Sequence, residues 1–236
     1  MLFNAADKAL WRLALPMIFS NITVPLLGLV DTAVIGHLDS PVYLGGVAVG
    51  ATATSFLFML LLFLRMSTTG LTAQAFGAKD PQRLARALVQ PLGLALAAGA
   101  AIVLLRMPLI DLALHIVGGS EAVLEQARRF LEIRWLSAPA SLANLVLLGW
   151  LLGVQYARAP VILLVVGNVL NIVLDLWLVM GLHMNVQGAA LATVTAEYVT
   201  FFIGLLMARR VLALRGVLRV DAEKTPGAAI YAACWR

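Results

Sequence analysis

The sequence contains few charged residues for its length. Only 12% of its 236 residues are Asp, Glu, Lys or Arg, against roughly 25% in an average soluble domain. Hydrophobic residues make up 62% of the chain, and the mean hydropathy is +0.95. A soluble domain needs many charged side chains on the surface that faces water, and this chain has about half the usual share. The composition therefore excludes a soluble globular domain. The same apolar content excludes a disordered chain.

Cysteine and histidine are scarce as well. The single cysteine, Cys234, excludes an internal disulfide and a cysteine-held metal cluster. We expect His37, His115 and His183 to lie in separate outer loops, too scattered for a metal site. The sequence has no nucleotide-binding phosphate loop, zinc-protease motif or serine-hydrolase elbow. Its basic segments also lack interleaved aromatic residues. We therefore expect no enzyme, no cofactor and no nucleic-acid partner.

Long apolar runs are abundant. A transmembrane helix needs about 20 mainly apolar residues, and six stretches qualify: 13–36, 44–64, 88–105, 130–154, 161–181 and 188–208. The predicted fold class is all-α, a polytopic membrane protein with about six transmembrane helices. We divide the chain into a cytoplasmic N-terminus (1–12), a six-helix transmembrane lobe (13–208) and a basic cytoplasmic tail (209–236). Longer loops are expected after the second and third spans.

The distribution of Lys and Arg predicts that both termini are cytoplasmic, because positive residues gather on the inner side of a membrane. With the N-terminus inside, all but four Lys and Arg residues fall on the inner side. The outer segments then hold Arg106, Arg128, Arg129 and Arg134. This arrangement leaves no Lys or Arg in the middle of a span.

Small and helix-bending residues indicate where helices meet or bend. Gly46 with Gly50, and Gly149 with Gly153, form pairs one helical turn apart, and such pairs allow two membrane helices to approach closely. Pro16 lies in the first span, where a proline removes a backbone hydrogen bond and allows a bend. The alternative is a proline that is simply tolerated in a membrane helix.

Three acidic side chains fall within predicted spans: Asp31, Asp175 and Glu197. An ionisable group at the bilayer centre costs at least ~2.5–3.5 kcal/mol. Since no basic partner is expected nearby, each acid should hold a proton or exchange it for a cation. The alternative is that polar side chains only bond neighbouring helices. That alternative is weak for Asp31 and Asp175 because acids are costly structural contacts, and it stays open for Glu197.

The predicted depths bring several polar groups together. Asp31, Asp175 and Thr193 should each lie ~8–9 Å below the outer boundary at 1.5 Å per residue. Asn171 and Asp175 are four residues apart and share a helix face, as do Thr193 and Glu197. Carboxylate, amide and hydroxyl oxygens suit Na⁺, hydronium or a hydrogen-bonded proton. We therefore predict a cation site, with Glu197 as an accessory candidate.

Two segments carry a resemblance to a known family. The first, from Gly28 to Leu38, reads GLVDTAVIGHL, and the second, from Gly70 to Asp80, reads GLTAQAFGAKD. The pattern LALPMI precedes them. In this order and spacing the chain resembles, from about Lys8 to Arg215, the first lobe of multidrug and toxic compound extrusion (MATE) transporters. It is most similar to the branch named for the DNA-damage-inducible protein F.

The resemblance implies an antiporter of the bacterial inner membrane, with two six-helix lobes, that exports drugs or other organic compounds in exchange for H⁺ or Na⁺. It implies a bend in the first helix at Pro16. It also implies that the coupling ion, and any Na⁺, binds at one site formed by Asp31, Asn171, Asp175 and Thr193.

Only the N-terminal lobe of such a pump is present in this sequence, so we expect the tail 209–236 to be truncated or aberrant. The expected partners are a small organic substrate, the lipid bilayer, and the missing C-terminal lobe or a second copy. Two alternatives remain. One is a non-transporting membrane fragment or subunit, and the other is a lipid flippase of related architecture, which would need an anionic head-group site.

Overall fold

The computed structural model describes residues 7–8, 10–11, 15, 18, 22, 29–30, 32–36, 40–78, 80–154, 156 and 158–214. Every regular element in these ranges is a helix, and five helical stretches are long and apolar enough to cross a membrane. The chain is therefore an all-α integral membrane protein. Most of the first predicted span, including Asp31 and Pro16, lies outside the described residues.

The second predicted span is longer than expected. Helices α2 (Pro41–Leu60) and α3 (Phe63–Gly77) form one stretch with an interruption at Leu61 and Leu62. The loop predicted after the second span is therefore wrong, because α3 continues through it. The helix stops where a short connection leads to α4 (Pro81–Leu104), whose N-terminus is capped by the Asp80 carboxylate.

The region after the third span is also mostly helical. It contains α5 (Arg106–Val117) and the start of α6 (Glu121–Arg134), separated by a short turn. Gly118 and Gly119 have φ angles of 71° and 148° there, which favour glycine. His115 consequently lies on α5 and not in a loop.

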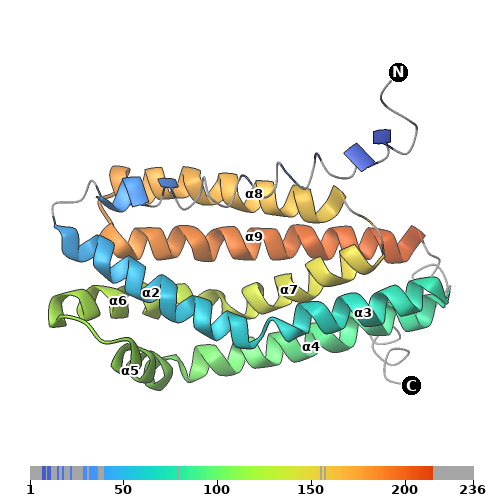
Figure 1. Ribbon diagram of the computed structural model, residues 1–236, viewed down its shortest axis with the longest axis horizontal. Coiled ribbons are helices and arrows are strands. Elements are labelled where there is room, and N and C mark those ends of the chain that lie inside the picture. Colours follow the sequence, from blue (N-terminus) through green and yellow to red (C-terminus); the bar gives the residue numbers. More distant parts are fainter. Residues whose placement is uncertain are drawn as a thin grey trace.

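The remaining elements complete the lobe. α6 continues through the short 3₁₀ helix η1 (Trp135–Ser137) into α7 (Ala138–Gly153), and α8 (Arg158–Asp175) continues into the π-helix η2 (Leu176–Gly181). The last helix within the described residues is α9 (Asn185–Leu214), which extends beyond the predicted end of the lobe at 208. Figure 1 shows the long helices running along one common direction, with α8 beside α9 and α3 beside α4.

The pair Gly46 and Gly50 is confirmed as a close helix contact. A methyl group on Gly46 would lie 2.4 Å from Cβ of Gln126, and one on Gly50 would lie 2.5 Å from a ring carbon of Phe130. Both neighbours belong to α6, so α2 packs directly on α6. A larger side chain at either glycine would force the two helices apart.

The pair Gly149 and Gly153 is confirmed in the same way, against α3. A methyl group on Gly149 would lie 2.6 Å from the Arg65 carbonyl oxygen, and one on Gly153 would lie 2.6 Å from Cβ of Thr72. α7 is thus held against α3, while its Asn144 and Leu148 line a cavity with α8 and α9. This arrangement places α7 in the wall of the cavity described below.

Candidate functional site

Three of the four residues predicted to bind the coupling ion lie in the described part of the chain. Asn171 and Asp175 occupy the last two turns of α8, and Thr193 lies near the start of α9. Asp31 is outside the described residues, so its part in the site stays a prediction.

A direct contact joins α8 to α9 at this level. The Asn171 amide nitrogen Nδ2 donates to Thr193 Oγ1 at 3.2 Å. The Thr193 hydroxyl in turn donates to the Ala189 carbonyl oxygen at 3.2 Å. Because the hydroxyl proton is used within α9, Thr193 presents a lone pair to Asn171. That lone pair holds the amide with its NH₂ group toward Thr193, so the carbonyl oxygen Oδ1 is left for another partner.

The two α8 residues carry buried acceptor atoms that lack donors. Asp175 is only 1% exposed and Asn171 4%. Within the described residues, Asn171 Oδ1 and both carboxylate oxygens of Asp175 have no hydrogen-bond partner. Buried polar atoms are nearly always bonded, so such an orphan requires an explanation. Carboxylate and amide oxygens are ligands that hard cations prefer, so a proton donor or a cation would satisfy this set.

The backbone changes form directly after Asp175. The chain leaves the α-helix and continues as the π-helix η2, which ends in bonds from Leu182 N to the Trp177 carbonyl at 3.0 Å and from Met184 N to the Leu178 carbonyl at 3.1 Å. Widened turns of this type occur often at functional sites. Asp175 therefore lies at a junction between two helical forms.

A cavity of about 250 Å³ opens between α7, α8 and α9. Asn171 and Thr193 line it, whereas Asp175 is not among its lining residues. The other polar side chains in its wall are Arg134, Asn144, Asn168, Glu197 and Thr200. The cavity thus joins part of the predicted cation site to a second polar region.

Arg134 lies at the end of the charged part of its helix. The helical stretch that contains it begins at Glu121, and the segment Glu121–Arg134 carries five other charged side chains before the apolar part begins. The position near the outer boundary that the sequence predicts for Arg134 therefore stays a prediction. Its guanidinium carbon lies 5.5 Å from the centre of the Phe58 ring, and its Nη1 donates to Ser137 Oγ.

Glu197, the accessory candidate, is held in the same cavity by Asn144 of α7. The Asn144 Nδ2 group donates to Glu197 Oε2 at 2.9 Å and to the Glu197 backbone carbonyl at 3.1 Å. Asn144 was not selected from the sequence, since a single asparagine in an apolar run gives no signal of its partner. Arg128 pairs with Asp111 and Arg129 with Glu125. No ion pair joins Arg134 to Glu197 within the described residues, although the two charges attract each other electrostatically.

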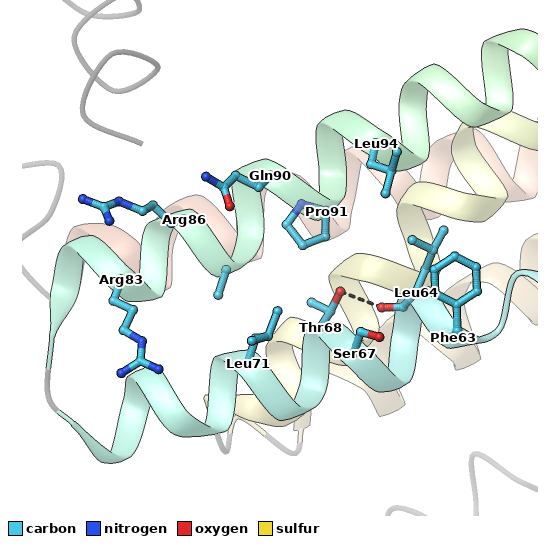
Figure 2. Close-up of a pocket in the computed structure, with 11 residues that line it drawn as sticks. Phe63, Leu64, Ser67, Thr68, Leu71, Arg83, Arg86, Gln90, Pro91 and Leu94 are labelled. Atoms are coloured by element: carbon cyan, nitrogen blue, oxygen red, sulfur yellow. Dashed lines mark hydrogen bonds between the residues drawn. The ribbon is translucent and has the colours of Figure 1, made fainter. Parts of the chain in front are cut away.

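A second, larger cavity of about 430 Å³ lies between α3 and α4. Figure 2 shows Arg83 reaching from α4 toward α3, and Arg86 and Gln90 of α4 also line this cavity. None of the predicted cation-site residues is among its described lining residues. The described ranges also contain no group of three or more His, Cys, Asp and Glu side chains that could hold a metal ion.

Known proteins resemble this chain in both sequence and structure. The MatE family model matches residues 16–177. DNA damage-inducible protein F of Escherichia coli is 89% identical over 214 residues, which cover 91% of this chain and 47% of that protein. Probable multidrug resistance protein NorM of Acinetobacter baylyi is 27% identical over 200 residues, or 83% of this chain and 44% of that protein.

A solved structure shows the same fold. A MOP superfamily transporter from Pyrococcus furiosus matches with a TM-score of 0.77 and 27% identity, over 96% of this chain and 50% of that one. The chain spans about half the length of the curated relatives it matches. The family model covers well over half of the chain. The chain therefore belongs to the MatE family, whose proteins are transporters rather than enzymes.

Proposed function

We propose that this chain forms the N-terminal lobe of a cation-coupled antiporter that exports drugs or other organic compounds across the bacterial inner membrane. Its termini would lie in the cytoplasm. The observation that carries the proposal is the set of buried acceptors on α8, Asn171 Oδ1 and the two Asp175 carboxylate oxygens, which have no donor among the described residues. Acceptors without donors suit H⁺ or Na⁺.

Each side chain has a separate role in this proposal. Asp31 and Asp175 bind the coupling ion, which can be a proton or Na⁺. Asn171 supplies its carbonyl oxygen, and Thr193 holds the amide in the orientation that makes this oxygen available. Glu197 is an accessory residue in the neighbouring cavity wall.

Coupling follows from a difference in ion affinity between conformations. Ion binding shifts the population toward the conformation that binds the ion more tightly, and a bend at Pro16 would be one such change. Alternating access requires two units that rock against each other. The proposal therefore includes a C-terminal lobe, or a second copy of this chain, as the partner.

The test uses a full-length chimera in which this lobe is joined to the second half of the Escherichia coli relative. Asp31→Asn and Asp175→Asn are introduced separately, and ethidium efflux is measured in proteoliposomes under a pH gradient or a sodium gradient. Each variant should lose gradient-driven efflux, because an amide cannot bind and release a proton or balance a sodium charge. The gradient that drives the unsubstituted chimera identifies the coupling ion.

The control is Asp80→Asn, since Asp80 caps α4 outside the site and asparagine caps a helix equally well. Its efflux should equal that of the unsubstituted chimera. If Asp31→Asn and Asp175→Asn leave efflux and drug resistance intact, the proposed coupling site is wrong. If the unsubstituted chimera inserts and folds but does not transport, the chain is a non-transporting subunit or fragment.

A further inference from the structure

Two opposite charges line one cavity without forming an ion pair. Arg134 of α6 and Glu197 of α9 both line the cavity that α7 and α8 also border, yet no ion pair joins them among the described residues. Glu197 lies ~18 Å along α9 from Asn185, so it sits well inside that span, whereas Arg134 lies where the charged part of α6 ends. A carboxylate within a membrane span is costly, and by default it indicates function.

Separate contacts hold the two charges apart. The Arg134 guanidinium bonds Ser137 at the start of α7 and lies against the Phe58 ring of α2. The Glu197 carboxylate accepts from Asn144 of α7. Each group therefore has its own anchor, although the two charges still attract each other across the cavity.

Both groups have unused bonding capacity. A guanidinium offers five N–H donors, and the hydrogen bond found for Arg134 within the described ranges uses one of them. Glu197 Oε2 accepts from Asn144, whereas Oε1 accepts no bond from the described residues. The cavity wall thus presents free donors at one point and a free anionic acceptor at another.

We propose that Arg134 and Glu197 form a subsite for the polar end of a zwitterionic substrate. An acidic group of the substrate, a carboxylate or a phosphate, binds Arg134, and a cationic nitrogen lies near Glu197. The planar guanidinium fork matches either anion with two parallel hydrogen bonds. This inference rests on the proposed transport function, because it specifies the substrate class for that cavity.

The size of the cavity limits what it can hold. Pockets for drug-sized molecules usually measure about 300–1,000 Å³, and this one measures about 250 Å³. It therefore fits the charged end of an amphipathic molecule, with the apolar remainder outside. A soluble zwitterion and a zwitterionic phospholipid head group share this chemistry, and the lipid source matches the flippase alternative that the sequence left open.

The test measures equilibrium binding to the purified full-length chimera in detergent, by fluorescence polarisation. The probes are tetramethylrhodamine, whose free carboxylate makes it a zwitterion, and its methyl ester, which is a cation. Arg134→Gln should weaken binding of the acid by about tenfold or more, the effect of one lost bond between charged groups. Binding of the ester should stay within about twofold. Arg134→Lys should keep an intermediate preference for the acid, because it keeps the charge and loses the fork.

Glu197→Gln should weaken the acid and the ester together, since both probes carry the cation. The matched control is Glu125→Gln, which removes the same charge from an exposed acid that pairs with Arg129. This control should leave the binding of both probes unchanged. A thermal melt of every variant shows that it is folded. If folded Arg134→Gln weakens both probes equally, or neither, the inference is overturned.

A competition arm identifies the source of the substrate. Short-chain phosphatidylethanolamine displaces the acid if the subsite takes lipid head groups, and it fails to do so if the subsite takes soluble zwitterions. The binding titration needs no ion gradient, so it can fail independently of the transport assay. If efflux is intact but the acid is bound no more tightly than its ester, only this inference is overturned. If the acid is preferred but no gradient drives efflux, only the coupling proposal is overturned.

Discussion

The lobe has two polar regions, one around Asn171 and Asp175 and one around Arg134 and Glu197. They differ in which of their polar atoms lack hydrogen-bond partners. Around Asn171 and Asp175, only acceptor oxygens lack partners within the described residues. Around Arg134 and Glu197, both signs of charge occur and each group has at least one bond. The first region can be completed by a small cation alone, whereas the second offers both charges to a molecule and is proposed above to bind a zwitterion. What a membrane-embedded polar site binds is therefore indicated by its missing partners.

The largest expected effect on stability comes from removing a hydrogen bond around Glu197, in the region where the charged groups have partners. Asn144→Leu removes the donor that holds Glu197 Oε2 and leaves a half-buried carboxylate with less support. The free energy of unfolding should fall by about 1.5–3 kcal/mol, the usual cost for a hydrogen bond to a charged group. The measurement is a denaturation titration of the full-length chimera in detergent.

A double-mutant cycle sharpens this prediction. In a Glu197→Leu background the carboxylate is gone, so Asn144→Leu should then cost much less. An equal cost in both backgrounds would mean that Asn144 contributes through packing of α7 rather than through Glu197.

The acceptor-only region should respond with the opposite sign. Asp175 is buried and its carboxylate oxygens have no bond among the described residues, so the folded state bears a desolvation cost there. Asp175→Leu should raise the free energy of unfolding by about 1–2 kcal/mol while it removes transport. A clear loss of stability in the same titration would contradict this and would indicate a partner for Asp175 in the first span.

The smallest effect is expected where the two regions meet. Thr193→Val removes the acceptor of Asn171 Nδ2 and should cost about 0.5–1 kcal/mol. Its control is Thr195→Val on the same helix, which should be close to neutral. Among the described residues the Thr195 hydroxyl bonds the Leu191 carbonyl of α9 alone, at 2.9 Å. Equal effects at the two threonines would mean that the Asn171 contact contributes nothing to stability.

Hydropathy predicted the membrane fold but not the lengths of its helices. The apolar runs located the five spans that the described residues contain, because burial in lipid requires about 20 apolar residues. They did not predict that α3 and α5 occupy the expected loops, because a helix can continue into water once its backbone bonds are made within itself. The partners of the glycine pairs, α6 and α3, also depend on packing that sequence spacing does not contain.

The site was predictable only in part, for a related reason. Spacing along one helix placed Asn171 and Asp175 together, and the depth estimate put Thr193 at their level, where Asn171 bonds it. Arg134 was not selected as a cavity residue, because its contacts with Ser137 and Phe58 and its place in the cavity wall depend on packing. Contacts between distant segments of this kind are visible only in the folded lobe.

The length of the stretch Pro41–Gly77 has a further consequence. Its 37 residues would measure about 55 Å if straight, whereas the hydrocarbon layer is about 30 Å thick. Part of this stretch must therefore project beyond the lipid into the aqueous phase. The projecting turns offer attachment points for water-soluble labels that cannot cross the bilayer, and these labels would report directly which way the protein is inserted.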